Sequence, residues 1–518
     1  MTQTETQALT VLRVHADDTV AVAVDALAAG TTVEVAGRAV VLADDVSAGH
    51  KLALVGHDEG EAVVKYGFPV GRATAPIAPG DWVHSHNLAT ALTGEETYHF
   101  HQPFVPQSSE ATATLTFEGY ERPDGRVGTR NELWVLNTVG CVNRAAERIA
   151  RMADRRYGPA GAGLIDGAHS FSHPFGCSQL GDDLQYTRTI LAALARHPNC
   201  SGVLVLGLGC ENNQLAAFVE AADPDGSRRA AGRLKAITAQ LVDDEIEAGM
   251  EAVDALVEVM QHDRRTTVPA SRLVLGMKCG GSDGFSGLTA NPLVGRISDR
   301  MAALGGRVVL TEVPEMFGAE QVLLDRAMSR PVFDATVAMI DGFKRYFLDH
   351  DQPVYENPSP GNKDGGLTTL EEKSLGAIQK GGRAPVAEVV AYGHQASVVG
   401  SEGFTPGLAL LEAPGNDGVS ATALTAAGAT LVLFTTGRGT PLGFPAPTVK
   451  IATNPDLAAR KPHWIDASAG PLLTGEADVD TLTDTFLADL LAIASGRRTN
   501  NETNDYREIA IWKHGVTL

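Results

Sequence analysis

The chain has 518 residues, of which 44% are hydrophobic and 20% are charged, and its formal net charge is −21. Such a length allows two to four domains with sizeable cores, whereas the acidic balance argues against a nucleic-acid partner or an anionic membrane surface. We expect a cytoplasmic protein with reduced thiols, because the sequence has no apolar run of about 18 residues, no start typical of a signal peptide and only five cysteines.

Residues 1–90 are predicted to form a small domain of short β-strands. Strand-like segments at 31–35 and 38–42 are separated by Ala36-Gly37, and further short apolar segments with glycine and proline turns follow up to residue 84. Many short strands of this kind indicate a compact β-barrel or β-clip. Residues 91–115 are polar and without a period, so they are predicted to be a linker or an extended arm.

From residue 116 onward the pattern changes to strands that alternate with helices. Helical stretches are predicted at 142–155, at 180–197 and within 234–261, and the last long helix at about 480–495. Short apolar runs bounded by glycine are typical of buried parallel strands. We therefore expect an α/β fold with Rossmann-like parallel sheets, divided into an α/β domain at 116–390 and a C-terminal α/β domain at 391–518.

Four cysteines follow strand-like runs on glycine-rich turns: Cys141, Cys177, Cys210 and Cys279. Ligands of open α/β sheets bind beyond the carboxyl ends of the strands, and thiolates suit iron, zinc or an iron–sulfur cluster. Cys177, Cys210 and Cys279 are thus candidate metal ligands in a shared site. The alternative is that each is a small buried hydrophobic residue. Cys200 precedes a strand and has no predicted role.

Two carboxylates and a pair of glycines accompany these cysteines. Glu211 follows Cys210, and Asp283 follows Cys279 after Gly280 and Gly281. Either acid is a candidate metal ligand or catalytic acid or base, or else a first-turn acid that complements a helix dipole. The Gly280-Gly281 turn is predicted to expose backbone N–H groups that can donate hydrogen bonds to an anion.

Basic and amide side chains on other predicted turns are candidates for substrate binding. Arg438 lies between two glycines after a strand, which suits bidentate capture of a carboxylate, and Lys450 is near in sequence. Asn362 follows a proline-rich loop and is a candidate polyol contact. The alternative for each is an ordinary structural or exposed turn.

The N-terminal module supplies candidates for proton transfer. His15 lies at a strand end, and His50 and Lys51 form a turn. Histidine is the usual proton carrier near neutral pH, so these residues are predicted to serve as acid and base if the small module closes over the sheet. A histidine in a turn is more often simply exposed.

Several longer motifs resemble the altronate/galactarate dehydratase family, and the resemblance covers nearly the whole chain. They are residues 117–120, 127–132, 176–183, 207–214, 279–283, 289–292, 357–363 and 436–441. The N-terminal module is similar to the SAF (β-clip) domain of that family. Residues 311–320 and the tail 514–518 resemble the altronate branch most closely.

The resemblance implies that a sugar acid loses water and gives a 2-keto-3-deoxy acid, with ferrous iron or manganese required. Altronate would give 2-keto-3-deoxygluconate. A metal chelated by the substrate would act as a Lewis acid, while a base removes the C2 proton and an acid protonates the departing C3 hydroxyl. Because a related sulfolactate sulfo-lyase divides the two modules between chains, the fold does not set the leaving group.

Three alternatives stay open at this point. The substrate is another aldarate or aldonate such as galactarate; the enzyme is an iron–sulfur dehydratase with a three-cysteine cluster; or the protein is a non-catalytic sugar-acid sensor. The sensor is disfavoured because the sequence has no evident DNA-binding element. We further expect a homo-oligomer whose partner is a small-molecule sugar acid.

Overall fold

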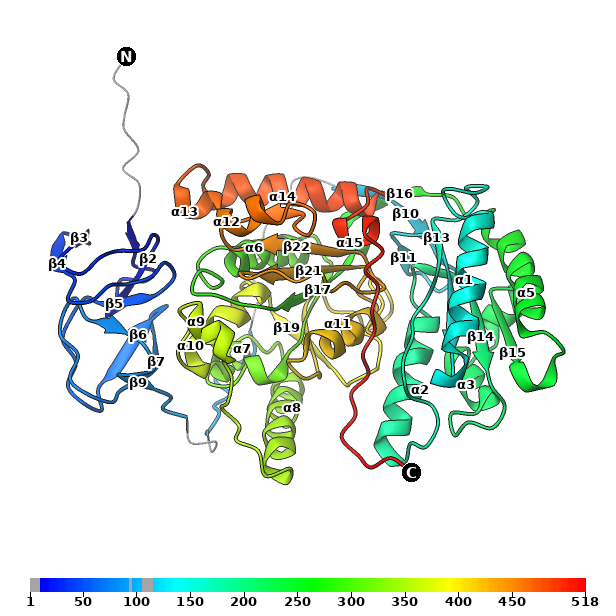
Figure 1. Ribbon diagram of the computed structural model, residues 1–518, viewed down its shortest axis with the longest axis horizontal. Coiled ribbons are helices and arrows are strands. Elements are labelled where there is room, and N and C mark those ends of the chain that lie inside the picture. Colours follow the sequence, from blue (N-terminus) through cyan, green and yellow to red (C-terminus); the bar gives the residue numbers. More distant parts are fainter. Residues whose placement is uncertain (1–9, 93–95, 105–114) are drawn as a thin grey trace, which may run out of the picture.

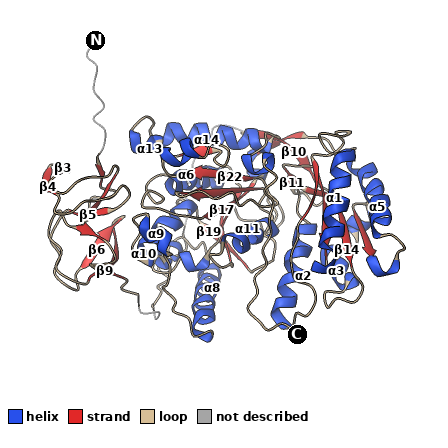
Figure 2. Ribbon diagram, viewed as in Figure 1, coloured by secondary structure: helices blue, strands red, loops and turns tan. Residues whose placement is uncertain are grey.

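The chain forms a small β module and two α/β units, which follow one another along the long axis of the molecule (Figures 1 and 2). The computed structural model describes residues 10–92, 96–104 and 115–518. The expected mixed α/β fold, with a small N-terminal module and parallel sheets behind it, is confirmed. Within the predicted linker, residues 93–95 and 105–114 lie outside the described residues.

The N-terminal module is built of short antiparallel strands. Its strands are β1 (Val11–Leu12), β2 (Val20–Ala23), β3 (Thr32–Val35), β4 (Arg38–Val41), β5 (Lys51–Ala53), β6 (Ala62–Lys65), β7 (Phe68–Ala73), β8 (Trp82–Val83) and β9 (Leu88–Ala89). Two of its hairpins turn through two residues with positive φ, at Ala36-Gly37 and Tyr66-Gly67. These turns match the right-handed twist of the paired strands and thereby set their register.

The second unit contains a parallel sheet in the order β13-β12-β14-β15, at the far end of the molecule from the β module (Figure 1). The strands are β12 (Glu132–Asn137), β13 (Gly167–Ser170), β14 (Cys200–Gly207) and β15 (Leu234–Thr238). Alternate residues of β12 pack to opposite sides, Val135 against α1 (Asn143–Tyr157) and α5 (Glu245–Met260), and Trp134 toward α2 (Gly181–Ala195). Both faces of the sheet are therefore buried, as the apolar runs predict.

Three further strands join this unit to the rest of the chain. They form the antiparallel sheet β11-β10-β16, from β10 (Thr116–Glu121), β11 (Val127–Gly128) and β16 (Thr266–Pro269). The remaining helices of the unit are η1 (Gly140–Val142), α3 (Leu215–Ala222), α4 (Ser227–Ala230) and η2 (Ala239–Leu241). The predicted helical stretch within 234–261 thus contains a strand as well as a helix.

The C-terminal unit occupies the centre of the molecule around a seven-stranded parallel sheet, β19-β20-β18-β17-β21-β22-β23. Its strands are β17 (Val274–Cys279), β18 (Arg307–Leu310), β19 (Val386–Val390), β20 (Gly407–Leu411), β21 (Leu431–Thr436), β22 (Thr448–Ala452) and β23 (Ala467–Ser468). Strands from both sides of the predicted boundary at residue 390 belong to this one sheet.

Helices cover both faces of the seven-stranded sheet. In Figure 1, α6 (Ala290–Ala303) and α14 (Val479–Ala494) run along one side, and α11 (Asp417–Ala426) lies on the other. The other helices are η3 (Ala270–Arg272), η4 (Val313–Glu315), α7 (Glu320–Leu324), α8 (Arg330–Asp349), α9 (Pro360–Asp364), α10 (Leu370–Ala377), η5 (Ile378–Gly381), α12 (Pro455–Arg460), α13 (Pro471–Thr474) and α15 (Asn500–Thr503). No helix among the described residues is both long enough and apolar enough to cross a membrane.

Backbone contacts join the three parts. The N-terminal module meets the C-terminal unit at Gly49 and Gly284. A Cβ on Gly284 would lie 1.9 Å from the carbonyl oxygen of Gly49, so the two backbone segments approach too closely for a side chain there. The C-terminal tail then leaves the central unit and pairs Thr517 with Gln179 of the second unit (Figure 1).

Candidate functional site

A cavity of about 500 Å³ opens at the carboxyl ends of β17, β18 and β20. Three loops that follow these strands supply one wall: Cys279–Gly281, Pro314-Glu315 and Pro414–Asp417. Helices and the tail complete it with Phe343, Tyr346, Phe347, Pro353, Val354, Glu356, Asn357, Ser359, Asn362, Lys373 and Trp512. The volume suits a small polar ligand, and the position is the one at which parallel sheets bind ligands.

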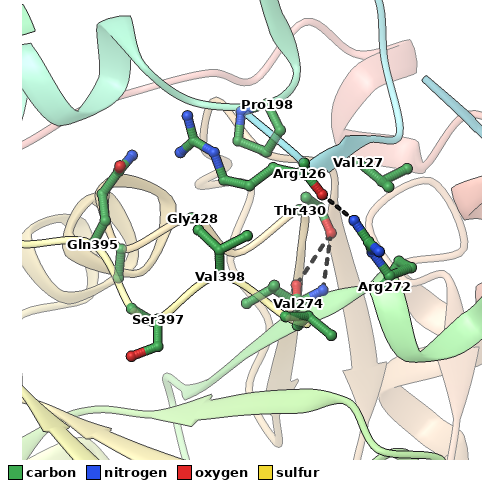
Figure 3. A pocket seen from close by; sticks show the side chains of 14 residues that line it. Arg126, Val127, Pro198, Arg272, Val274, Gln395, Ser397, Val398, Gly428 and Thr430 are labelled. Carbon is green, nitrogen blue, oxygen red and sulfur yellow. Dashed lines mark hydrogen bonds between the residues drawn. The ribbon is translucent and has the colours of Figure 1, made fainter. Parts of the chain in front are cut away.

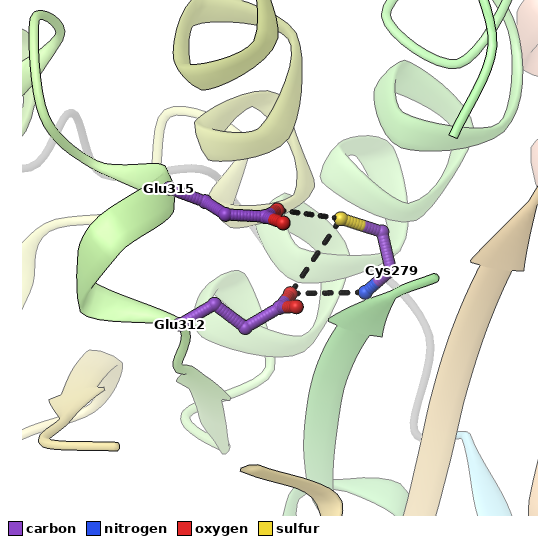
Figure 4. A group of neighbouring side chains, drawn as sticks. All are labelled: Cys279, Glu312 and Glu315. Atoms are coloured by element: carbon purple, nitrogen blue, oxygen red, sulfur yellow. Dashed lines mark hydrogen bonds between the residues drawn. The ribbon is translucent and has the colours of Figure 1, made fainter. Parts of the chain in front are cut away.

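Figure 4 shows the side chains of Cys279, Glu312 and Glu315 pointing toward one another. Cys279 and Glu315 also line the cavity. The thiol Sγ of Cys279 lies 2.9 Å from Oε2 of Glu315 and 3.5 Å from Oε2 of Glu312, whose carboxylate also accepts the Cys279 N–H at 3.0 Å. Throughout the described part of the chain, this is the one group of three or more such ligand atoms that all lie within 4.8 Å of one another.

Three buried lysines balance the two carboxylates. Lys373 Nζ lies 2.7 Å from Oε1 of Glu315, Lys380 Nζ lies 3.3 Å from Oε2 of Glu312, and Lys278 pairs with the other oxygen of Glu312. Buried charges cost several kcal/mol unless they are paired. The cluster is therefore a set of mutually compensating buried charges at the edge of the cavity.

The charges shift the pKa values of the cluster in opposite directions. Burial alone would raise the pKa of Glu315, but the lysines around it, first among them Lys373, lower it to about 2. For Lys373 burial opposes the charged form, yet the attraction of Glu315 raises the pKa of that ammonium. Burial raises the pKa of the Cys279 thiol, and the neighbouring carboxylates add to this effect. The resting site thus holds an ionised Glu315, a charged Lys373 and a protonated thiol.

The backbone at Glu312 is unusual. Glu312 has φ 72° and ψ 61°, in the left-handed region that costs a residue with a Cβ about 1–2 kcal/mol. Its carboxylate is fully buried between Lys278, Lys380 and the N–H of Cys279. These contacts offset the backbone cost and hold the loop after β18 against the end of β17.

Four of the predicted site residues line the cavity: Cys279, Gly280, Gly281 and Asn362. Gly281 has φ 64°, which favours glycine, and its carbonyl accepts N–H groups of the loop after β21. Asn362, on α9, donates its Nδ2 to the carbonyl of Ser282 at 2.8 Å and presents its Oδ1 to Lys373 at 3.4 Å. The glycine turn and the amide are therefore parts of one wall, as the strand-end interpretation predicts.

Three other predicted residues lie near this wall but do not line the cavity. Arg438 is exposed, and its Nη1 is 3.4 Å from the carbonyl of Gly361. Lys450 is buried and donates to the Thr440 carbonyl; burial lowers its pKa to about 8. Asp283 accepts from Thr453, Asn454 and Ser286, and burial raises its pKa. In this structure Lys450 and Asp283 hold their loops through these bonds.

The predicted acid and base groups of the N-terminal module also lie outside the cavity. His15 is exposed beside Asp17. His50 contacts the carbonyl of Asp364 at 3.2 Å, and burial lowers its pKa. Lys51 is fully buried against Glu372 at 2.8 Å. His50 and Lys51 thus meet the outer side of the helices whose inner side forms the cavity wall.

The remaining predicted residues belong to the second unit. Cys177 and Cys210 are exposed on loops after β13 and β14, whereas Glu211 is buried and accepts from Thr138, Leu208 N–H and Gly209 N–H. Neither cysteine shares a close ligand group with Cys279 among the described residues. The structure therefore does not bring the three predicted thiol ligands together.

Glu312, Glu315, Lys373 and Lys380 were not predicted from the sequence. The two glutamates had a detectable signal, because they lie within the motif at 311–320 that resembles the altronate branch. No such signal marks Lys373 or Lys380, whose helices come from a distant part of the chain.

A second hollow, between the second and C-terminal units, is much smaller (Figure 3). It is lined by Arg126, Arg272, Val398 and Thr430 among others, and its volume is about 20 Å³. That space holds about one water molecule. It is too small for a sugar acid, whereas the 500 Å³ cavity, at the carboxyl edge of the parallel sheet, is the candidate active site.

Comparison with known proteins covers all three parts of the chain. Residues 9–91 match the altronate/galactarate dehydratase SAF domain, residues 119–261 the second domain of D-galactarate dehydratase/altronate hydrolase, and residues 270–517 the C-terminal domain of D-galactarate/altronate dehydratase.

Curated relatives match over nearly their full length. The chain is 50% identical to altronate dehydratase of Escherichia coli (98% of this chain, 99% of the relative) and 46% identical to that of Bacillus subtilis (98% and 99%). It is 31% identical to galactarate dehydratase (L-threo-forming) of Escherichia coli (95% and 94%). The chain therefore belongs to the altronate/galactarate dehydratase family.

Proposed function

We propose that this chain is a hydro-lyase that converts D-altronate to 2-keto-3-deoxy-D-gluconate in the 500 Å³ cavity. Full-length identity of 46–50% to two altronate dehydratases is the observation that carries the proposal. The cavity supports it, because it places a buried charged cluster at the carboxyl edge of a parallel sheet.

The reaction needs a cation at the substrate carboxylate. Loss of the C2 proton makes an enolate-like species whose charge grows on that carboxylate, and preorganised charge stabilises it best. We assign this role to Lys373, whose ammonium lies at the wall between Glu315 and the amide oxygens of Asn357 and Asn362. The amides of Asn357 and Asn362 supply neutral contacts for the sugar hydroxyls.

Proton transfer requires one base for C2 and one acid for the C3 hydroxyl. Glu315 is held ionised with a pKa of about 2, which makes it a weak base. The other carboxylates of the wall are Glu356 and Asp417, and Oδ1 of Asp417 lies 2.8 Å from Lys278. We assign proton removal to one of these two side chains; Glu356→Gln and Asp417→Asn variants distinguish them by which one loses turnover.

A metal cofactor is consistent with the buried group at the wall. Cys279, Glu312 and Glu315 offer one sulfur and two carboxylate oxygens, a mixed donor set that suits ferrous iron or manganese, and two of the three residues face the cavity. We propose that these three residues would hold the ion, which when bound supplies Lewis-acid polarisation of the substrate.

Galactarate is the second candidate substrate, because galactarate dehydratase is a relative at 31% identity over nearly the whole chain. One difference between the two sugar acids is at C6, where galactarate carries a second carboxylate. An additional cation on the cavity wall would favour it, and Lys373 is the one lysine or arginine among the residues that line the cavity. The wall thus favours the monocarboxylate.

The test is anaerobic turnover by metal-stripped protein with D-altronate, with 2-keto acid as the readout and ferrous or manganous ion added in turn. We expect ion-dependent product from D-altronate, and a loss of at least about 100-fold in Glu315→Gln. Glu402→Gln, at an exposed carboxylate that does not line the cavity, is the matched control. Product from galactarate but not from altronate would overturn the substrate assignment.

A further inference from the structure

Three glycine–cysteine pairs lie at the carboxyl edge of the second unit's parallel sheet. Gly140-Cys141 follows β12, Gly176-Cys177 follows β13 and Gly209-Cys210 follows β14. These strands are adjacent, in the order β13-β12-β14, and all three thiols are exposed. Free cysteine is among the most buried residue types, so three exposed thiols at one sheet edge call for an explanation.

Backbone hydrogen bonds hold the three loops against one another. Gly140 N–H donates to the Phe175 carbonyl at 2.9 Å, and Asn213 N–H donates to the Gly176 carbonyl at 2.9 Å. A Cβ on Gly176 would lie 2.0 Å from the Thr138 carbonyl oxygen, so only glycine permits this approach. The loops that carry Cys141 and Cys177 are therefore directly packed, and the loop of Cys210 packs on that of Cys177.

Side chains rigidify the same edge. Ser178 N–H donates to Oδ1 of Asn212 at 2.8 Å, and Ser178 itself has φ 57° in the left-handed region. Buried Glu211 accepts from Thr138 and from two N–H groups of its own loop. Gln240 donates to Sγ of Cys210 at 3.6 Å. The edge is thus preorganised and polar, as a ligand site is, although no residue of it lines the 500 Å³ cavity.

The edge is a different place from the cavity. Trp512 lines the cavity, and six residues later the Leu518 N–H donates to the Ser178 carbonyl. This segment keeps the edge within roughly 20 Å of the cavity wall, although the two places belong to different sheets. The other two cysteines do not belong to the edge: Cys279 ends β17 in the other sheet, and Cys200 is buried at the start of β14.

We propose that Cys141, Cys177 and Cys210 ligate an iron–sulfur cluster on the second unit, with one iron left free of cysteine for an oxygen ligand such as a hydroxy acid. This ligand set replaces Cys279 of the predicted trio by Cys141. Thiolates from separate loops that follow parallel strands are suitable ligands for such a cluster.

The spacing of the sulfurs favours a cluster over a single ion. A tetrahedral ion with bonds of about 2.3 Å to sulfur holds its thiolates about 3.8 Å apart. The three sulfurs do not all lie within 4.8 Å of one another. A polynuclear cluster is wider and spans such a set without requiring the loops to close.

The experiment is anaerobic reconstitution of the full chain with ferric iron, sulfide and excess dithiothreitol, which reduces part of the iron so that the mixed ferrous and ferric cluster can form; it is followed by visible absorbance, electron paramagnetic resonance after reduction, and acid-labile sulfide analysis. We expect a brown protein with about four sulfides per chain. Cys141→Ser, Cys177→Ser and Cys210→Ser should each lose most of the sulfide and colour, whereas Cys200→Ser and Cys279→Ser keep both. Circular dichroism checks that each exposed substitution leaves the fold intact.

A wild-type protein that stays colourless and free of sulfide would overturn the cluster, and so would binding of zinc alone by the three thiols. Equal loss of sulfide in Cys279→Ser would also overturn this ligand set. The dehydratase proposal is tested by a different readout. A colourless enzyme that converts D-altronate would contradict the cluster and support the dehydratase proposal. A brown protein that does not convert D-altronate would support the cluster and contradict the dehydratase proposal.

Discussion

At the scale of single residues, the candidate active site depends on a balance of buried charges. Glu315 accepts from the Cys279 thiol and pairs with Lys373, and Glu312 lies between Lys278 and Lys380. Removing one member of a buried pair costs more than the pair contributes, because the other charge is left without compensation. Substitutions in this cluster are therefore expected to affect both stability and turnover, and the two effects have to be separated by measurement.

Lys373 offers the sharpest test. Lys373→Met removes the one lysine or arginine among the described residues that line the cavity. Stabilisation of the developing carboxylate charge is then lost, and we expect kcat/KM for D-altronate to fall by about 100-fold or more. Lys373→Arg retains the charge and should recover part of kcat. Lys461→Met, which removes a lysine that lies over the Trp464 ring outside the cavity, is the matched control. Equal kcat/KM in Lys373→Met and wild type would remove Lys373 from the site.

Part of this site could be predicted from the sequence. Cys279, Gly280 and Gly281 were found because the end of a parallel strand is a place defined by local pattern. Glu315 and Lys373 were not singled out, since their meeting depends on how the loop after β18 and helix α10 pack, and no local period encodes that packing. The predicted roles of Arg438 and the N-terminal histidines stay predictions.

At the scale of elements, helix α10 has two functional sides. Glu372 faces the N-terminal module, where Lys51 and Lys65 each approach its carboxylate at 2.8 Å, and the next residue, Lys373, faces the cavity. Burial alone would raise the pKa of Glu372, but the two lysines lower it to about 2. The small β module supplies no residue to the cavity wall, yet it fixes the helix that does.

Glu372→Gln should therefore lower both stability and turnover. Two buried lysines would lose their shared counter-charge, for which we expect a loss of about 3–5 kcal/mol in unfolding free energy by denaturant titration. The displaced α10 should lower kcat more than it raises KM. Glu371→Gln, whose carboxylate accepts from Thr90 and the Ala91 N–H, is the neighbouring control and should cost less. A variant Glu372→Gln with wild-type kcat would show that the module does not position Lys373.

Element types were predictable where the period was strong. The predicted helices at 142–155 and 180–197 correspond to α1 (Asn143–Tyr157) and α2 (Gly181–Ala195). The prediction for the stretch 234–261 was partly wrong, because its first five residues form the edge strand β15 and the α-helix begins only at Glu245. A short half-buried edge strand has too few residues to establish its own period.

At the scale of the whole molecule, the second and C-terminal units are joined by buried polar contacts. Arg130 of the second unit pairs with Glu502 at 2.7 Å, and Thr129 donates to the Thr430 carbonyl at 3.2 Å. His197 contacts the Ala429 carbonyl through Nε2 at 3.0 Å. Such contacts specify one arrangement of the two units, because each buried group has its partner on the other unit.

His197 makes this junction sensitive to acid. Its Nδ1 accepts the Asn199 N–H at 3.1 Å, so the proton of the neutral ring sits on Nε2. Because the ring is fully buried, a second proton on Nδ1 would place an uncompensated charge there and break the bond with Asn199. Burial lowers the pKa of His197 to about 3, well below the value of about 6.5 in the unfolded chain. The unfolded state therefore binds more protons between these values, and stability falls as the pH drops below about 6.5.

We expect this residue to account for a loss of about 2 kcal/mol in unfolding free energy between pH 7 and pH 5, since each pH unit below the unfolded pKa contributes about 1.4 kcal/mol. Gln keeps a donor for the Ala429 carbonyl and does not titrate, so the stability of His197→Gln should depend less steeply on pH over that range. His262→Gln, at an exposed histidine, should retain the wild-type slope. Denaturant titrations at several pH values measure all three; parallel slopes for His197→Gln and wild type would show that the junction does not depend on the neutral ring, and would place the acid sensitivity in the paired carboxylates instead.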